Sequence, residues 1–265
     1  MPSPLLSDAT FRRLCQFVHQ ATGISLNEGK RSLVISRLTP RIQATRCPDF
    51  ESYLDRLERD PSAPEVTAAL NALTTNKTSF FRHPEQFEYL RSVLAASESR
   101  IRVWSAGCST GEEPYSIAMV VRQHLSAHNV TDARILATDL STEVLEIAKR
   151  GEYPESSLDD VPAALRRPYF DAAPGRPVTV KPSLRSLISF GYLNLNSTWP
   201  MRGPFDAIFC RNVMIYFTEA TRAELASRFA RLLRPGGALI LGLTESLTTR
   251  PETLRHAMPS IFERI

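Results

Sequence analysis

Two glutamates directly after a glycine-bearing loop are the residues of this sequence best suited to bind a ligand. The apolar run 101–104 is typical of a buried strand, and the loop Gly107–Gly111 follows it. Pro114 then stands where the first turn of a helix tolerates proline. Strand, loop and helix form the first unit of a nucleotide-type site. Its glycines, such as Gly107, let a ligand approach the backbone, and the helix N-terminus offers free N–H groups.

The charge at this helix start indicates which ligand it accepts. The loop has neither a G-x-G-x-x-G pattern nor the lysine of a phosphate-binding loop. Glu112 and Glu113 favour the helix dipole but would repel a pyrophosphate. We therefore expect a ligand that is cationic or neutral at this end. S-adenosyl-L-methionine (SAM), which has a sulfonium, an amino group and no phosphate, fits.

Polar residues also follow the later strands. A strand over 134–138 ends at Asp139, where an acidic residue usually binds ribose hydroxyls; the alternative is that Asp139 or Ser141 caps the next helix. Asn194 follows an expected strand at 187–193, and Arg211-Asn212 follows one at 205–210. Ligands of open parallel sheets lie beyond the carboxyl ends of the strands. The sequence therefore predicts that these residues converge on one site.

The alternation of strand and helix from about residue 100 to 245 predicts an α/β fold with a parallel, doubly wound sheet. Prolines interrupt it at 151–185, where we expect a small antiparallel insert with residues 178–181 as an edge strand. We expect a tight turn at 234–237, a strand at 238–243 and an antiparallel edge strand at 259–265.

Residues 1–75 are expected to form a separate helical domain, and residues 76–265 the sheet domain. Ser7 or Thr10 is suited to cap a first helix that ends at Gly23. Further helices are expected at 33–42 and 50–59, followed by a proline break at 61–64 and a polar bridge at 69–82.

One face of the helix at 33–42 is basic. It is either a solvated surface or an electrostatic dock for an acidic partner. Its basic residues are Lys30, Arg31, Arg37, Arg41 and, farther on, Arg46.

Composition narrows the class of protein. The chain has 265 residues, 43% of them hydrophobic, and a net charge of +4, which is too mild to imply nucleic acid. It has no apolar run of about 18 residues and no secretory-type N-terminus, so we expect a cytoplasmic protein without membrane insertion. The histidines have no metal-ligand spacing, and the cysteines are expected to be buried thiols, not a disulfide framework or zinc site. These are Cys15, Cys47, Cys108 and Cys210.

The sequence also has features of two other functions. The motif G-C-S-T-G matches the nucleophile elbow of hydrolases, with Ser109 as nucleophile and Asp206 and His256 in plausible order. That elbow needs oxyanion donors from an earlier strand loop, whereas only helices are expected before residue 100. The second alternative is a docking module that binds SAM only as a regulatory ligand.

Five segments together resemble the chemotaxis receptor glutamate O-methyltransferases, the CheR family. They are LTTNKTSFFR (73–82), RVWSAGCSTGEEPYSIAM (102–119), ATDLSTEVLEIAKRGEY (137–153), GPFDAIFCRNVMIYF (203–217) and LLRPGGALILGLTES (232–246). The resemblance implies a Rossmann-like SAM-dependent methyltransferase domain, an all-helical N-terminal receptor-docking domain and a small antiparallel β-subdomain. It also implies transfer of a methyl group from SAM to receptor glutamates, with S-adenosyl-L-homocysteine (SAH) as product.

The resemblance implies roles for individual residues as well. Glu113 is implied to contact the methionyl amino group, Asp139 the ribose, and Asn194 with Leu195 the adenine. Arg82 and Tyr216 are implied to lie nearest the transferred methyl group, as the catalytic residues. Others that border the cofactor by the same resemblance are Asn76, Thr78, Arg211 and Asn212.

The implied partner is the glutamate-rich cytoplasmic helical region of transmembrane chemoreceptors, which the basic face would steer. Two departures from the pattern stand out. Ser105 occupies a position that is usually acidic in this fold, and Ser109 replaces a glycine of the loop. The segment 171–177 is shorter than the glycine-rich loop of members that bind a receptor's C-terminal pentapeptide, which counts against that tether.

Overall fold

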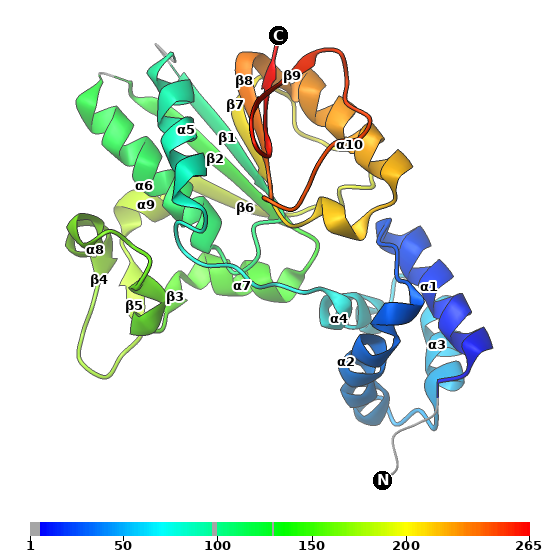
Figure 1. The fold of residues 1–265 in the computed structure, drawn as a ribbon. Helices are drawn as coiled ribbons and strands as arrows, with labels where there is room; N and C mark the ends of the chain where they lie inside the picture. The colour runs from blue at the N-terminus through cyan, green and yellow to red at the C-terminus, as the bar shows by residue number, and fades with distance from the viewer. Residues whose placement is uncertain (1–5, 97–99, 129) are drawn as a thin grey trace. The chain divides into compact units, whose positions relative to one another are not determined.

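The computed structural model describes residues 6–96, 100–128 and 130–265. The chain folds into two compact units, Met1–Thr75 with Tyr216–Thr218, and Asn76–Ile215 with Glu219–Ile265. Figure 1 shows the helices of the first unit and the central sheet of the second. Each unit is described by itself.

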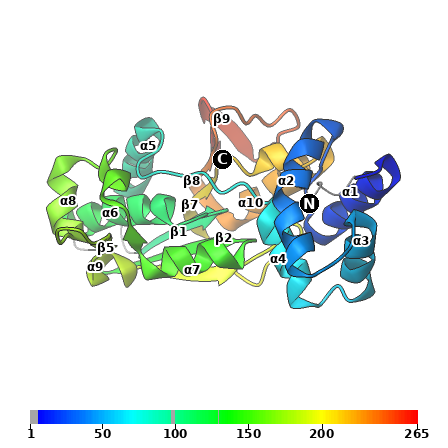
Figure 2. The same ribbon diagram turned by 90° about the horizontal axis from the view of Figure 1, so that it is seen from below.

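The first unit is helical. It contains α1 (Asp8–Thr22), η1 (Glu28–Lys30), α2 (Arg31–Ala44), α3 (Phe50–Arg59) and α4 (Pro64–Leu73) (Figure 2). Ser7 caps α1, since its hydroxyl accepts a 3.1 Å hydrogen bond from Thr10 N, and Gly23 ends the helix with φ of 78°. Helix α3 has the predicted bounds, whereas α4 extends into the expected polar bridge. The shared apolar core comprises Phe11, Leu14, Val18, Val34, Leu38, Ile42, Phe50, Tyr53, Leu54, Leu57, Val66, Ala69 and Leu73.

The second unit contains a seven-stranded sheet with the order β6-β2-β1-β7-β8-β10-β9. The first five strands are parallel: β6 (Ile188–Tyr192), β2 (Asp132–Asp139), β1 (Arg100–Ala106), β7 (Phe205–Cys210) and β8 (Leu233–Leu241). The pair β10 (Ile261–Arg264) and β9 (Leu254–Met258) extends the sheet in antiparallel fashion. The chain leaves β1 in one direction for β2 and β6 and returns to place β7 on its other side. The switch point between β1 and β7 is where such sheets bind ligands.

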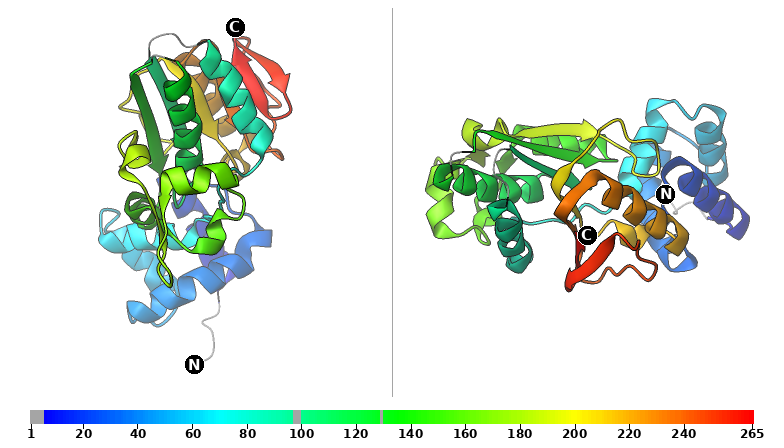
Figure 3. Two further views of the ribbon diagram at one scale, coloured as in Figure 1. Left: turned by 90° about the vertical axis from the view of Figure 1, so that its left-hand side faces the viewer. Right: turned by 90° about the horizontal axis from the view of Figure 1, so that it is seen from above.

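The side chains of β1 alternate between two apolar cores. Ile101 and Val103 belong to the core that includes residues of α5 (Pro84–Ala95), α6 (Glu112–Ala127) and α7 (Thr142–Arg150). The Trp104 ring contacts Trp199 and Phe229 instead, with ring centroids 4.9 and 5.2 Å away, and Phe229 lies in α10 (Glu219–Leu232). Helices therefore cover both faces of the sheet, as Figure 3 shows. The doubly wound α/β fold is confirmed.

The insert forms a separate three-stranded antiparallel sheet with the order β3-β5-β4. Its elements are β3 (Glu152–Tyr153), η2 (Glu155–Leu158), α8 (Ala163–Tyr169), β4 (Phe170–Asp171), β5 (Val178–Val180) and α9 (Pro182–Arg185). The prediction of an edge strand at 178–181 was wrong, because β5 pairs on both sides, with Tyr153 opposite Val178 and Phe170 opposite Val180.

The prediction of an edge strand at 259–265 was also wrong. The turn expected at 234–237 lies within β8 as a bulge, because the pairing with β7 passes from Phe205–Leu233 to Ala207–Ala238 and Gly236 has φ of 70°. At Gly237 the strand runs so close to β7 that an added Cβ would lie 3.0 Å from the Asp206 carbonyl oxygen. The tail strand β10 is not at the edge, because β9 covers it.

The prediction that the four cysteines are buried thiols is confirmed for two of them. All four cysteines are free, but only Cys108 and Cys210 are buried, whereas Cys15 and Cys47 are half-buried. Among the described residues, no helix combines the length and apolarity needed to cross a membrane. Within the same residues, no cluster of three or more His, Cys, Asp or Glu side chains is arranged to hold a metal ion.

Gly111 offers a test of how tightly the loop before α6 is packed. Its φ is +103°, and an added Cβ would lie 2.7 Å from Tyr153 Oη and 2.9 Å from Ala148 Cβ. We expect Gly111→Ala to lower the free energy of unfolding by about 2–4 kcal/mol, measured by urea denaturation. Gly175→Ala is the control: its φ is +70° but nothing lies within 4 Å of the added Cβ. The control should lose only about 1–2 kcal/mol. If both variants lost the same free energy of unfolding, the close contacts at Gly111 would not be the cause of the destabilisation.

Candidate cofactor site

The glycine-bearing loop is fastened to the end of β2. The backbone N–H groups of Gly107 and Cys108 donate to the Thr138 carbonyl oxygen at 2.8 and 2.9 Å. Ser109 N donates to Asp139 Oδ2 at 2.9 Å. Gly107 has φ of 91°, and an added Cβ would lie 2.4 Å from Val213 Cγ2, so only glycine fits here. The structure therefore joins the ends of β1 and β2 at the switch point.

Asp139 holds the loop backbone and does not cap the following helix. Its second oxygen, Oδ1, accepts from Ser141 N at 2.9 Å, and Ser141 is the residue that caps α7. Asp139 is buried, and this burial raises the pKa of its carboxyl group, although hydrogen bonds from Ser141 and Ser109 oppose the shift. The backbone carbonyl of Asp139 accepts from Leu193 N at 3.0 Å, so Asn194 follows immediately beside it.

A buried ion pair spans the switch point. Glu113, in the first turn of α6, lies 3.2 Å from the Arg211 guanidinium, which follows β7. Both residues are only 7% exposed. Ser105, at the end of β1, donates its hydroxyl to the other Glu113 oxygen at 2.7 Å. Ser105 thus supports an acidic residue in the first turn of α6.

Burial shifts the pKa values of Glu113 and Arg211 more than the attraction between their charges does. Desolvation raises the pKa of Glu113, which Arg211 and the Ser105 hydroxyl offset only in part. Desolvation likewise lowers the pKa of Arg211. A further cation near Glu113, or an anion near Arg211, would therefore stabilise the charged forms. The Arg211 Nε atom is buried and has no hydrogen-bond partner among the described residues. The pair thus retains capacity for a ligand that carries both charges.

The segment 76–83 crosses the start of α6. The Asn76 carbonyl accepts from Ser109 Oγ at 3.0 Å, and Phe81 N donates to Ser116 Oγ at 2.9 Å. Arg82 donates to the Lys77 carbonyl at 3.2 Å, and its own carbonyl accepts from Arg211. Thr78 lies half-buried in the same segment.

The predicted adenine contacts lie just past β6. Leu195 is buried, and its carbonyl accepts from Trp199 Nε1 and Arg228 Nη1, each at 3.0 Å. Asn194 is half-buried, and its side-chain oxygen accepts from Asn196 N at 2.9 Å. The loop that carries both residues is therefore held by bonds from its own backbone and from α10.

Backbone strain marks the same segments. Non-glycine residues with positive φ include Phe81 (48°), His83 (63°), Ser109 (50°) and Asn212 (58°). Such conformations cost about 1–3 kcal/mol each and concentrate at functional sites. The sequence has no periodic signal for them. Sequence reasoning also missed Glu245, which is buried beside Asn212.

Tyr216 is not among the residues of the sheet unit. It ends η3 (Met214–Tyr216) and belongs with Phe217 and Thr218 to the helical unit, where its carbonyl accepts from Ser25 N at 2.7 Å. Its catalytic role stays a prediction.

The basic face of α2 is less solvated than its sequence indicates. Arg31 pairs with Asp8 and Glu28 at 2.9 and 3.0 Å, and Arg41 pairs with Glu65. Arg37 is exposed but donates to the carbonyls of Ala72 and Thr74, both at 3.1 Å. Arg46 is exposed and takes part in none of the ion pairs among residues 6–96, 100–128 and 130–265. It is therefore the most available of the four arginines.

The hydrolase alternative fails on geometry. Asp206 accepts from Arg102 N at 2.8 Å and pairs with Arg234 at 2.7 Å, so it lies at the amino end of β1. Ser109 follows the carboxyl end of the same strand. His256 lies on β9, opposite Phe262. These three residues do not form a triad.

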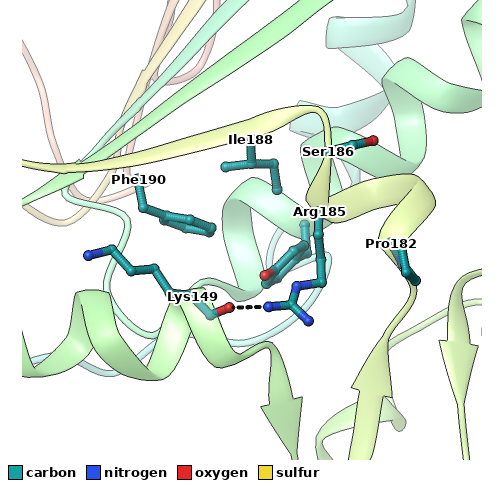
Figure 4. A pocket seen from close by; sticks show the side chains of 7 residues that line it. Lys149, Pro182, Arg185, Ser186, Ile188 and Phe190 are labelled. Atoms are coloured by element: carbon teal, nitrogen blue, oxygen red, sulfur yellow. Dashed lines mark hydrogen bonds between the residues drawn. The ribbon is translucent and has the colours of Figure 1, made fainter.

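A pocket of about 410 Å³ lies elsewhere on this unit (Figure 4). The Arg185 guanidinium points at the carbonyl of Lys149 and donates to it at 2.8 Å. The other lining residues are Tyr115, Pro182, Ser186, Ile188 and Phe190. None of the predicted cofactor residues lines this pocket, so it is separate from the site at the switch point.

The fold and the charged cluster at its switch point define a SAM-binding methyltransferase domain, and comparison with known proteins agrees. Residues 76–261 match the family model described as CheR methyltransferase, SAM binding domain, and residues 9–74 match its all-alpha domain. The chain therefore belongs to the CheR methyltransferase family.

Full-length relatives support this assignment. The chain is 42% identical to the chemotaxis protein methyltransferase of Salmonella typhimurium, covering 92% of this chain and 85% of the relative. It is also 42% identical to the Escherichia coli protein of that name, covering 92% and 86%. Chemotaxis protein methyltransferase 2 of Pseudomonas aeruginosa is 36% identical, with 98% and 97% covered.

A double-mutant cycle tests the buried ion pair. Glu113→Gln and Arg211→Met each leave the partner without its counter-ion and should cost about 3–5 kcal/mol. We expect the double variant to lose less than the sum, with a coupling free energy of about 1–3 kcal/mol by urea denaturation. The control is the Arg255–Glu263 pair, whose side chains are 62% and 23% exposed. Its coupling should stay below about 1 kcal/mol. Equal coupling in both pairs would contradict the buried interaction.

Proposed function

We propose that this protein transfers a methyl group from SAM to glutamate side-chain carboxylates of chemoreceptors (methyl-accepting chemotaxis proteins). The product is a glutamate methyl ester, which tunes sensory adaptation. The observation that carries this proposal is the buried Glu113–Arg211 pair at the switch point of a CheR-family SAM-binding domain, with Asp139 at the end of the neighbouring strand β2. The names of the relatives supply the chemotaxis context.

The residues present suit SAM. Glu113 would hold the methionyl amino group, and the unpartnered Arg211 Nε would donate to the methionyl carboxylate. Asp139 would accept from the ribose hydroxyls, and Asn194 and Leu195 would contact the adenine. The remaining cofactor neighbours in this proposal are Asn76, Thr78, Arg82, Gly107 and Asn212. Bound SAM supplies an electrophilic methyl group on a sulfonium and leaves as SAH.

The proposed acceptor needs no general base. A glutamate with an ordinary pKa of about 4.3 is ionised at neutral pH. The chain has only to orient the carboxylate and exclude water. We assign that orientation to Arg82 and Tyr216. Because both reactants lose charge as they meet, strong stabilisation of the separated charges would slow the reaction. Arg82 and Tyr216 are thus aligning groups and not activators of a nucleophile.

The proposed partner is the glutamate-rich helical region that chemoreceptors carry on their cytoplasmic side, and the protein would act there without entering the membrane. Lys30, Arg37 and Arg46 are the exposed cations of the basic face, whereas Arg31 and Arg41 already pair with carboxylates. In the insert, only residues 172–177 connect β4 to β5. This short connection supports a protein that does not depend on a receptor's C-terminal pentapeptide.

The test of this function is incubation of candidate receptor fragments with methyl-labelled SAM, followed by mapping of the modified side chains. The proposal requires base-labile methyl groups on glutamates. Label on other residues, or none on any receptor fragment, would contradict it.

Arg82 provides a test of the proposed alignment. We expect Arg82→Ala to lower kcat/KM for receptor methylation by about 100-fold or more, since misplaced reactants lose that much. Arg91→Ala is the control, because Arg91 is a surface arginine of α5, 39% exposed and 3.6 Å from Glu88. The control should retain wild-type activity. Near wild-type methylation by the Arg82 variant would refute the assignment.

Charge reversal at Arg46 tests receptor docking. Arg46→Glu should raise the KM for a receptor fragment about 3- to 10-fold at low salt and flatten its salt dependence, while SAH affinity stays unchanged. Arg202→Glu, at an exposed residue of the sheet unit, makes the same change in net charge outside the basic face. If both variants behave alike, the basic face is not the docking surface.

A further inference from the structure

Glu245 links the ends of β7 and β8 through three hydrogen bonds. Its Oε2 atom accepts from Asn212 N at 2.7 Å and from Gly242 N at 2.6 Å. Its Oε1 atom accepts from Ile215 N at 3.1 Å. The residue is only 6% exposed. A buried carboxylate that collects backbone N–H groups from two segments fixes their relative positions.

The surrounding backbone is shaped to admit this carboxylate. An added Cβ at Gly242 would lie 2.7 Å from Glu245 Oε2 and 2.9 Å from Asn212 N. Asn212 adopts φ of 58°, which is strained for a residue with a side chain. The Glu245 bond to Asn212 N offsets that strain. Glu245 therefore fixes the backbone of the loop after β7 through specific hydrogen bonds.

The loop that Glu245 fastens carries the proposed cofactor residues. Arg211, which pairs with Glu113, immediately precedes Asn212. Ile215 immediately precedes Tyr216 in the chain. Glu245 thus holds the backbone at two positions within the Arg211–Tyr216 stretch that the proposed reaction uses.

We propose that Glu245 is a positioning residue for methyl transfer, which fixes the 212–215 loop so that Arg211 and Asn212 meet SAM correctly. This inference rests on the proposed function. It predicts that the carboxylate, and not merely a side chain of that shape, is required. Glutamine has one acceptor oxygen, and its amide NH₂ would face at least one of the three backbone N–H groups. The Ile215 bond is the one most readily lost, because Oε2 serves two donors and Oε1 only one.

The experiment compares Glu245→Gln with Glu263→Gln. Glu263 lies on β10 in the same unit and accepts bonds from Arg255 and Tyr89, so the control makes the same chemical change away from the loop. For Glu245→Gln we expect about a tenfold rise in the Kd for SAH by calorimetry, because weakened or lost hydrogen bonds no longer fix the loop that carries Arg211 and Asn212. We also expect a lower kcat, an unchanged KM for receptor fragment and faster hydrogen exchange at Ile215 N.

The control variant should bind SAH like the wild type. If both variants weaken SAH binding equally, or if Glu245→Gln binds SAH and methylates normally, Glu245 has no positioning role. Glu245→Asp, which keeps the charge but is one methylene shorter, should also weaken SAH binding; wild-type affinity in that variant would overturn the geometric argument. Failure of the proposed function is distinct, since the wild type itself would then not methylate receptor glutamates, whereas the comparison of SAH affinities still tests Glu245.

Discussion

The buried Glu113–Arg211 ion pair is the interaction on which the site depends. Two charges that are this deeply buried are costly, and their attraction alone does not repay their desolvation. The surrounding structure compensates with neighbours: Ser105 donates to Glu113, and the Arg82 carbonyl accepts from Arg211. One pair thereby ties together the end of β1, the end of β7 and the segment 76–83. The site forms because the sheet brings these segments to the same edge.

Asp139 and Glu245 extend the same principle to the neighbouring strands. Each is a buried carboxylate that accepts backbone N–H groups, Asp139 from the loop after β1 and Glu245 from the loop after β7. Strained residues, such as Ser109 and Asn212, sit directly beside these acceptors. The conformation of each loop is therefore stabilised by a buried carboxylate that accepts hydrogen bonds from the loop's N–H groups. A preorganised site of this kind suits a reaction that requires alignment more than activation.

Much of this arrangement could be predicted from the sequence because the strands and their ends have local signals. The apolar run before Gly107 and the run before Arg211 identify β1 and β7, and parallel topology then brings Glu113 and Arg211 to one edge. Contacts between residues that are far apart in the chain have no local sequence signal. That Arg41 bonds Glu65, or that Glu245 bonds Asn212, follows only from tertiary packing. Short strands are equally hard to place: β5 has three residues, and its central position depends on what pairs with it.

Calorimetric titration of SAH into the wild type and the Glu113→Gln variant tests the central claim most directly. If Glu113 and Arg211 form the centre of the cofactor site, the wild type will bind SAH, and the variant will bind it about 10- to 150-fold more weakly, because a charge-assisted interaction with a buried carboxylate contributes about 1.5–3 kcal/mol. Equal affinity in the two proteins would contradict this account.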